Sequence, residues 1–151
     1  MIAYALSYIV VTRIVLDTNV LTGAMLSHTG ENRRLLRACL EGKFRPIIGQ
    51  TLFCEYEDVL TRRELFRNCP LSETDRMSLL DALLSVSEWV KVYYSWRPNL
   101  RDEGDNHLIE LAIAGSANMI VTNNVRDLLS AELRFPGLRI MRPHELLREV
   151  Q

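Results

Sequence analysis

The stretch that decides the fold is Ile14-Val15-Leu16-Asp17-Thr18-Asn19-Val20. Its first three residues are apolar and mostly β-branched, and they stand between the charged residues Arg13 and Asp17. This pattern predicts a short buried strand, with a helix beginning near Thr18. A carboxylate directly after a buried strand is held at the rim of the sheet, where ligands bind in open α/β sheets.

Outward from this strand, short apolar runs alternate with longer helical patterns. Further strands are expected at residues 45–49, 89–94, 119–122 and 138–141. Helices are expected over residues 31–41 and 51–63, from Ser72 (followed by Asp75 at capping-box spacing), from Glu103 or Gly104 to about Gly115, and from Pro143. This order is typical of a parallel sheet with helices on both faces. We therefore predict an α/β three-layer sandwich around a mainly parallel sheet of four or five strands.

The composition is that of a single packed domain. Of the 151 residues, 48% are apolar and 25% are charged, which excludes a disordered tail, a collagen-like repeat and a fibrous rod. The formal charge of −1 gives no basic excess of the kind that marks many nucleic-acid-binding domains. Only Lys43 and Lys91 of the 18 basic residues are lysines. An arginine bias suits a phosphate-bearing partner, and genomic base composition explains it equally well.

From its cysteine usage we expect a cytoplasmic protein. Cys39, Cys54 and Cys69 lack CxxC spacing, which argues against a zinc site or a disulfide framework. The apolar stretch from Met1 to Val11 is too short to span a bilayer and lacks the basic start of a signal peptide. We expect no membrane association, and residues 1–12 are interpreted as an extension before the first core strand.

Several acids stand near predicted strand ends or helix starts. Asp127 lies five residues beyond Thr122, and Asp102, Glu103 and Asp105 cluster where the next helix begins. Asp105 shares a predicted helical face with Leu108, Ile109 and Ala112, so it is expected to point toward the sheet. Structural roles stay open, because Asp17 can cap a helix and acids at a helix N-terminus gain about 0.3–1 kcal/mol from its dipole.

The helix predicted over residues 51–63 offers two further acids. Glu55 borders the apolar stripe near Leu52 and Val59, and Glu57 borders its other edge beside Phe53 and Leu60. Helical geometry does not separate the two.

Four of these acids come from four different elements: Asp17, Glu55, Asp105 and Asp127. If they converge, each carboxylate raises the pKa of the others, and a hard divalent cation relieves that repulsion. Mg²⁺ and Mn²⁺ prefer oxygen ligands, and such a site activates water and neutralises a phosphodiester in its transition state.

These motifs resemble the PIN-domain family, in particular the VapC-like toxin components of toxin–antitoxin pairs. The resemblance rests on residues 14–20 (IVLDTNV), 55–60 (EYEDVL), 101–106 (RDEGDN, with Leu111-Ala112 after it) and 121–128 (VTNNVRDL), and it extends from about Arg13 to Arg142. It implies a single PIN-like domain over residues 1–151.

The resemblance also implies a metal-dependent endoribonuclease acting on single-stranded RNA. The family's catalytic and metal-binding acids fall on Asp17, Glu55, Asp105 and Asp127, with one or two Mg²⁺ or Mn²⁺ ions. Thr18, Asn19, Thr122 and Asn123 fall where side chains support these acids. Family members usually form homodimers, and the toxins are held inactive by a cognate antitoxin.

Two positions leave alternatives. Many relatives carry an acid directly after the fourth core strand, where this chain has Asn123 and Asn124, so a three-acid site without Asp127 is one alternative. Asp102 is the second choice for the third acid. The alternative function is that of a catalytically degenerate PIN-fold protein that binds RNA or a protein partner.

Among the basic residues, Arg101 is the strongest candidate for contacting substrate phosphate, because it adjoins the third acidic motif. The three histidines, His28, His107 and His144, lack metal-ligand spacing, and we assign none of them to the site.

Overall fold

The computed structural model describes residues 10–27, 29–93, 106–129, 135 and 137–150. Its strands form one sheet in the order β3-β2-β1-β4-β5, and all neighbouring strands are parallel. They are β1 (Thr12–Leu16), β2 (Phe44–Ile48), β3 (Glu88–Trp89), β4 (Met119–Val121) and β5 (Arg139–Met141). The predicted parallel sheet of four or five strands is confirmed.

Helices connect these strands in the predicted alternation, except that the short helix between β4 and β5 was not predicted. They are α1 (Thr18–Leu26), α2 (Glu31–Leu40), α3 (Gln50–Leu60), α4 (Glu73–Ser85), α5 (Asn106–Ala114), α6 (Val125–Leu129) and α7 (Pro143–Glu149). Within the part of the chain that the structure describes, none of the helices combines the length and the apolar character needed to cross a membrane.

The central strand is β1, because its residues suit burial on both faces. Ile14 and Val15 are fully buried and Leu16 is nearly so. Ile14 pairs with Met119 of β4 on one side and with Pro46 of β2 on the other. A strand covered on both faces needs such a continuous apolar run.

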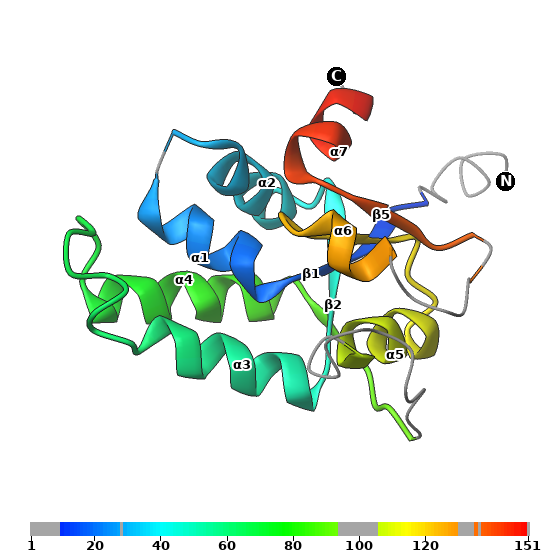
Figure 1. Ribbon diagram of the computed structural model, residues 1–151, viewed down its shortest axis with the longest axis horizontal. Coiled ribbons are helices and arrows are strands. Elements are labelled where there is room, and N and C mark those ends of the chain that lie inside the picture. Colours follow the sequence, from blue (N-terminus) through cyan, green and yellow to red (C-terminus); the bar gives the residue numbers. More distant parts are fainter. Residues whose placement is uncertain (1–9, 28, 94–105, 130–134, 136, 151) are drawn as a thin grey trace, which may run out of the picture.

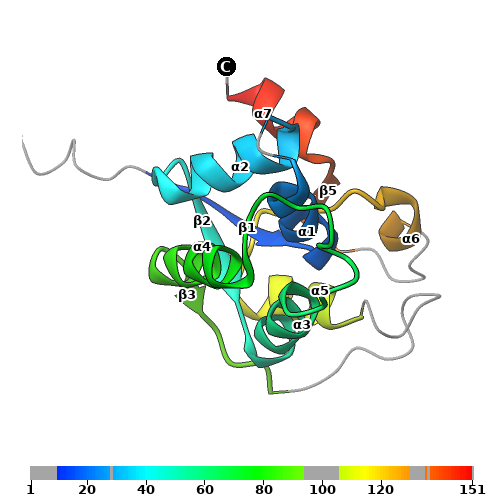
Figure 2. The same ribbon diagram turned by 90° about the vertical axis from the view of Figure 1, so that its left-hand side faces the viewer.

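Helices cover both faces of the sheet and complete a three-layer sandwich, as predicted. Helices α1 to α4 contact one another and lie mainly to the left of β2 in Figure 1, whereas α5 packs on β1, β2 and β4 and lies to its right. This division follows from right-handed crossovers, because the chain moves outward from β1 to β3 and then returns to β4. Figure 2 shows α7 beside α2, which it contacts.

The third strand is shorter than predicted. Only Glu88 and Trp89 pair with β2, and the N–H of Val90 adds one bond of 2.8 Å to the carbonyl of Ile48. The prediction of a strand from Trp89 to Tyr94 was therefore wrong in extent, although Tyr94 itself lies outside the described residues. The reason is that β2 ends at Ile48, so the chain beyond Val90 runs past the end of its neighbouring strand.

Two predicted helix boundaries have the expected chemistry. Ser72 Oγ accepts the N–H of Asp75 at 3.1 Å and the Asp75 carboxylate accepts the N–H of Ser72 at 3.2 Å, which confirms the capping box. Helix α5 ends just before Gly115. A Cβ at Gly115 would lie 2.7 Å from Cγ2 of Ile47, so glycine there allows α5 to approach β2 closely.

Candidate active site

The site is centred on Asp17, where β1 ends and α1 begins. The N–H of Asp17 donates to the carbonyl of Val121 at 2.9 Å, which ties this residue to the end of β4. Asp17 occupies the N-cap position of α1, yet its side chain makes no capping hydrogen bond. Helix capping therefore does not account for the orientation of its carboxylate.

Two side chains hold the Asp17 carboxylate from the end of β4 and from α1. Thr122, which is fully buried, donates its hydroxyl to Oδ2 of Asp17 at 2.7 Å. Asn19 donates Nδ2 to the same oxygen and to Oγ1 of Thr122, both at 3.3 Å. The Thr122 hydroxyl also accepts the N–H of Asn124 at 3.0 Å, so its proton is left to point at Asp17.

A second set of amides positions Asn19. The N–H of Asn123 donates to Oδ1 of Asn19 at 3.1 Å, and Nδ2 of Asn123 donates to Oδ1 of Asn32 in α2 at 3.1 Å. Helix α2 therefore supports the site through Asn123, which the sequence resemblance placed among the supporting residues.

Thr18 contributes through its backbone. Its N–H acts on the neighbouring carboxylate of Asp17 and lowers the pKa of that group. Its hydroxyl Oγ1 is buried and has no hydrogen-bond partner within the described part of the chain. The backbone N–H of Thr18, and not its side chain, is thus the group that influences Asp17.

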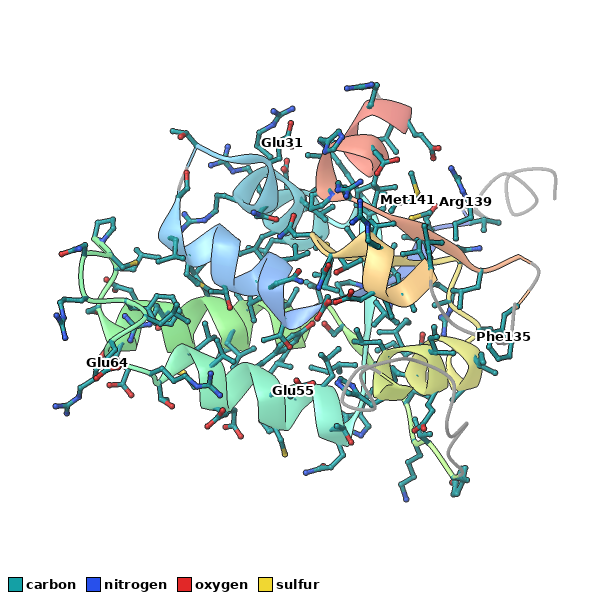
Figure 3. The ribbon with its side chains drawn as sticks, viewed as in Figure 1. Glu31, Glu55, Glu64, Phe135, Arg139 and Met141 are labelled. Atoms are coloured by element: carbon teal, nitrogen blue, oxygen red, sulfur yellow. The ribbon has the colours of Figure 1, made fainter. Side chains whose placement is uncertain are left out.

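The structure distinguishes between the two candidate acids of α3, Glu55 and Glu57. Glu55 is half-buried and its Oε2 forms an ion pair with Nε2 of His107 at the start of α5, whereas Glu57 is exposed. Figure 3 shows Glu55 where α3 approaches α5, and these two helices contact each other. Of the two, Glu55 is the acid that lies toward the candidate site.

Tyr56 fixes α3 relative to the end of β1. Its hydroxyl donates to the carbonyl of Leu16, the residue before Asp17, at 2.6 Å. The side chain is buried, and burial raises the pKa of Tyr56 well above its ordinary value, so the hydroxyl keeps its proton. Because Glu55 is the residue before Tyr56, this bond also fixes the part of α3 that carries Glu55 relative to the end of β1.

The electrostatics of Asp17 reflect this arrangement. Burial raises its pKa above the ordinary value and is the largest influence. The hydrogen bonds from Thr122 and from the N–H of Thr18 lower the pKa, the charge of Glu55 raises it, and the charge of His107 lowers it. The charge of Glu55 therefore acts on Asp17, and a bound cation would relieve the repulsion between these two carboxylates.

The fourth predicted acid, Asp127, lies in α6 and is half-exposed. Its Oδ2 accepts Nδ2 of Asn124 at 2.5 Å. Within the described ranges, no group of three or more His, Cys, Asp or Glu side chains lies close enough to hold a metal. Asp102, Asp105 and Arg101 lie outside the described residues, so the structure brings together Asp17 and Glu55.

This donor set fits a hard divalent cation. It offers carboxylate oxygens, which Mg²⁺ and Mn²⁺ prefer, and Mg²⁺ typically binds through one or two carboxylates with several waters. The raised pKa of Asp17 agrees with a cation site. Burial disfavours the ionised carboxylate, and a bound cation would offset that cost.

Three contributing residues were not assigned to the site from the sequence. His107 reaches Glu55, Tyr56 reaches the end of β1, and Asn32 reaches Asn123 across large separations along the chain. Each contact depends on how helices pack, and no local pattern signals it. The one local feature that could have suggested a contact of this kind is Tyr56, a tyrosine on the apolar face of its helix and next to the candidate acid Glu55.

Comparisons with known proteins agree with this fold. A family model described as PIN domain matches residues 13–126. No curated protein matches the chain. A chain of the crystal structure of VapBC2 from Rickettsia felis bound to a DNA fragment from their promoter is similar in fold, with a TM-score of 0.57 and 18% sequence identity. The match covers 87% of this chain and 98% of that chain.

Proposed function

Because this chain belongs to the PIN domain family, we propose that it is a metal-dependent endoribonuclease that hydrolyses single-stranded RNA. Members of the family are generally nucleases, and these typically use divalent metals. The observation that carries the proposal is the half-buried Asp17 carboxylate, which Thr122 and Asn19 orient and on which the charge of Glu55 acts.

We propose Asp17 and Glu55 as ligands of Mg²⁺ or Mn²⁺, together with Asp105 (or Asp102) and Asp127. When bound, such a cation activates water and neutralises charge on the phosphodiester. Arg101 is proposed to contact the substrate phosphate, since guanidinium groups bind phosphate oxygens in a bidentate manner.

The chain's own residues prepare this site. Thr122 and Asn19 restrict the Asp17 carboxylate to one orientation before any ligand arrives, so little ordering is left for the bound state. His107 does the same for Glu55 from α5. Tyr56 connects the backbones that carry the two acids, because it bonds the carbonyl next to Asp17 and adjoins Glu55 in sequence.

We further propose that the protein is the toxin of a toxin–antitoxin pair, inhibited by a cognate antitoxin and active as a homodimer. The likeness in fold to a chain of VapBC2 supports this part of the proposal. The alternative is a PIN-fold protein without catalysis that binds RNA or a protein partner. It is favoured by Asn123 and Asn124, which stand where many relatives carry an acid.

The test is cleavage of end-labelled single-stranded RNA with Mn²⁺ and with a chelator. The variants are Glu55→Gln and, as a matched control on the same helix, Glu57→Gln. We expect cleavage that requires Mn²⁺, is lost in Glu55→Gln and is retained in Glu57→Gln. Cleavage that persists in chelator, or that both variants retain, rejects the mechanism. No cleavage by the wild-type protein, with RNA still bound, supports the non-catalytic alternative.

A further inference from the structure

A pocket of about 260 Å³ lies beside the candidate active site. Its walls are Gly49 with the first turn of α3, the last residue of β3 with the segment that follows it (Trp89 to Tyr93), and His107 with its neighbours in α5. Gly49 follows the carboxyl end of β2 and Val90 follows that of β3, so the pocket is at the same sheet edge as Asp17. His107 belongs to both places, because it lines the pocket and contacts Glu55.

Two exposed aromatic side chains belong to this pocket. The side chains of Trp89 and Tyr93 are 49% and 84% exposed, and both line it. The other aromatic residues that the structure describes are buried or half-buried: Phe44, Phe53, Tyr56, Phe66 and Phe135. Exposed aromatic surface in the described residues is therefore concentrated at this one place.

The indole of Trp89 is held in position from one side. Its ring contacts the ring of Phe53 in α3 edge to face, with centroids 5.7 Å apart and planes inclined at 63°. Half of the residue nevertheless remains exposed. A partly anchored aromatic ring with a free surface is the arrangement that stacks on an unpaired base, because every base has a flat π surface.

Polar groups in the same pocket suit the rest of a nucleotide. Lys91 is exposed and stands between the two aromatic residues in sequence, so it supplies a cation for a phosphate. Gln50 and Thr51 offer side-chain hydrogen-bonding groups at the pocket wall. Gly49 keeps this wall thin, since a Cβ there would lie 3.0 Å from Leu111 and 3.2 Å from the carbonyl of Val90.

We propose that this pocket is a nucleobase subsite, in which an unpaired base of single-stranded RNA stacks on Trp89 and an adjoining phosphate contacts Lys91. The subsite deepens the proposed function and rests on it for the identity of the substrate. It lies next to Glu55, so the base it binds is close in sequence to the phosphodiester at the acids. The requirement for an unpaired base is what makes the site select single strands.

The experiment measures binding without cleavage. All measurements use a background protein with two substitutions. Asp17→Asn removes a proposed metal ligand, and Trp96→Phe leaves Trp89 as the sole tryptophan, because the chain has two. The probes are a 12-nucleotide single-stranded oligoadenylate and an RNA duplex of the same length. We expect the single strand to quench the Trp89 fluorescence and the duplex to leave it unchanged.

Fluorescence anisotropy with the labelled single strand then tests the contribution of the ring. We expect Trp89→Leu to raise Kd by about 5-fold to about 100-fold, as for loss of one base–aromatic stack. Trp89→Phe should recover most of the affinity. Leu65→Ala, at an exposed apolar position in another part of the chain, is the matched control and should leave Kd unchanged. Thermal unfolding of each variant verifies that the contact with Phe53 is not needed for folding.

The outcomes separate the subsite from the nuclease. Absence of quenching, equal quenching by the duplex, or a Kd for Trp89→Leu within twofold of the background overturns the subsite. If wild-type protein still cleaves RNA in that case, the proposed function stands without it. If quenching and the loss of affinity are found but no RNA is cleaved, the subsite stands and the catalytic proposal fails.

Discussion

The two sides of the candidate active site are built differently. On the β1–β4 side, Asp17 is held by the hydroxyl of Thr122, directly after β4, and by the amide of Asn19 in the first turn of α1. On the α3–α5 side, Glu55 has a side chain that is 44% exposed, and its described partner is His107. The strand side is therefore prearranged by the core, whereas the helix side depends on the packing of two helices.

This difference shows which residues of the site are held most rigidly by the fold. Strand ends are fixed by hydrogen bonds between neighbouring strands and by full burial of residues such as Ile14 and Val15. A helix can shift slightly on the sheet with little loss of buried surface. Tyr56 compensates for this freedom, since its buried bond to Leu16 connects α3 to the strand side.

The largest expected effect is that of Asp17→Asn. We expect activity to fall by more than about 100-fold, which exceeds the effect typical of residues that only support ligands. The fold should remain intact, because asparagine still accepts the hydrogen bond from Thr122. An RNA cleavage assay measures the loss of activity, and circular dichroism shows whether the variant is folded. Loss of the folded state together with activity would contradict a purely functional role for this carboxylate.

Thr122→Val tests the strand side without removing an acid. The change keeps the shape but deletes the hydroxyl that donates to Asp17 and accepts from Asn124. We expect activity to fall by about 10-fold to about 100-fold, and Thr122→Ser to restore it. If valine and serine behave alike, hydrogen bonding to Asp17 is not what this residue provides.

A smaller effect is expected on the helix side for His107→Gln. Glutamine can still donate to Glu55, but it cannot carry a charge. We expect activity to fall by about 3-fold to about 10-fold, with His107→Ala more severe because it leaves Glu55 without this contact. The comparison between the two sides is reversed if His107→Gln proves more damaging than Thr122→Val.

The smallest expected effect concerns stability and pH in metal-free protein. Folding raises the pKa of Asp17 above its ordinary value of 3.8, so the folded state binds the proton more tightly than the unfolded state. This residue therefore contributes stability below pH 3.8 that is lost as the pH rises through its raised pKa. Chemical denaturation of wild type and Asp17→Asn across this range measures the contribution. We expect the free energy of unfolding of the variant, relative to that of wild type, to increase with pH. If the difference between the two proteins does not change with pH, burial does not raise the pKa of Asp17.

Much of the architecture was predictable, since it depends on local patterns. The apolar run before Asp17 predicted the central strand, and Ser72 with Asp75 predicted the start of α4. The pattern failed at Trp89 to Tyr94, because residues suited to a strand form one only where a neighbouring strand continues beside them. That condition depends on where β2 ends, which the segment itself does not reveal.

The candidate site was predictable only in part. The proximity of Asp17 and Thr122 follows from the rule that parallel strands end at one edge of the sheet, and the structure has that contact. The choice between Glu55 and Glu57 did not follow, because both border the same apolar stripe and the rotation of α3 on the sheet decides between them. His107 was missed for the same reason, since its contact with Glu55 exists only once α3 and α5 are packed.

The central claim is that Asp17, directly after β1, and Glu55 of α3 together hold one divalent cation. Electron paramagnetic resonance of free Mn²⁺, titrated into wild type, Asp17→Asn, Glu55→Gln and Glu57→Gln, tests it most directly. We predict that wild type and Glu57→Gln bind Mn²⁺ equally well and that Asp17→Asn and Glu55→Gln each lose at least about tenfold in affinity. Equal Mn²⁺ affinity in all four proteins would contradict the claim.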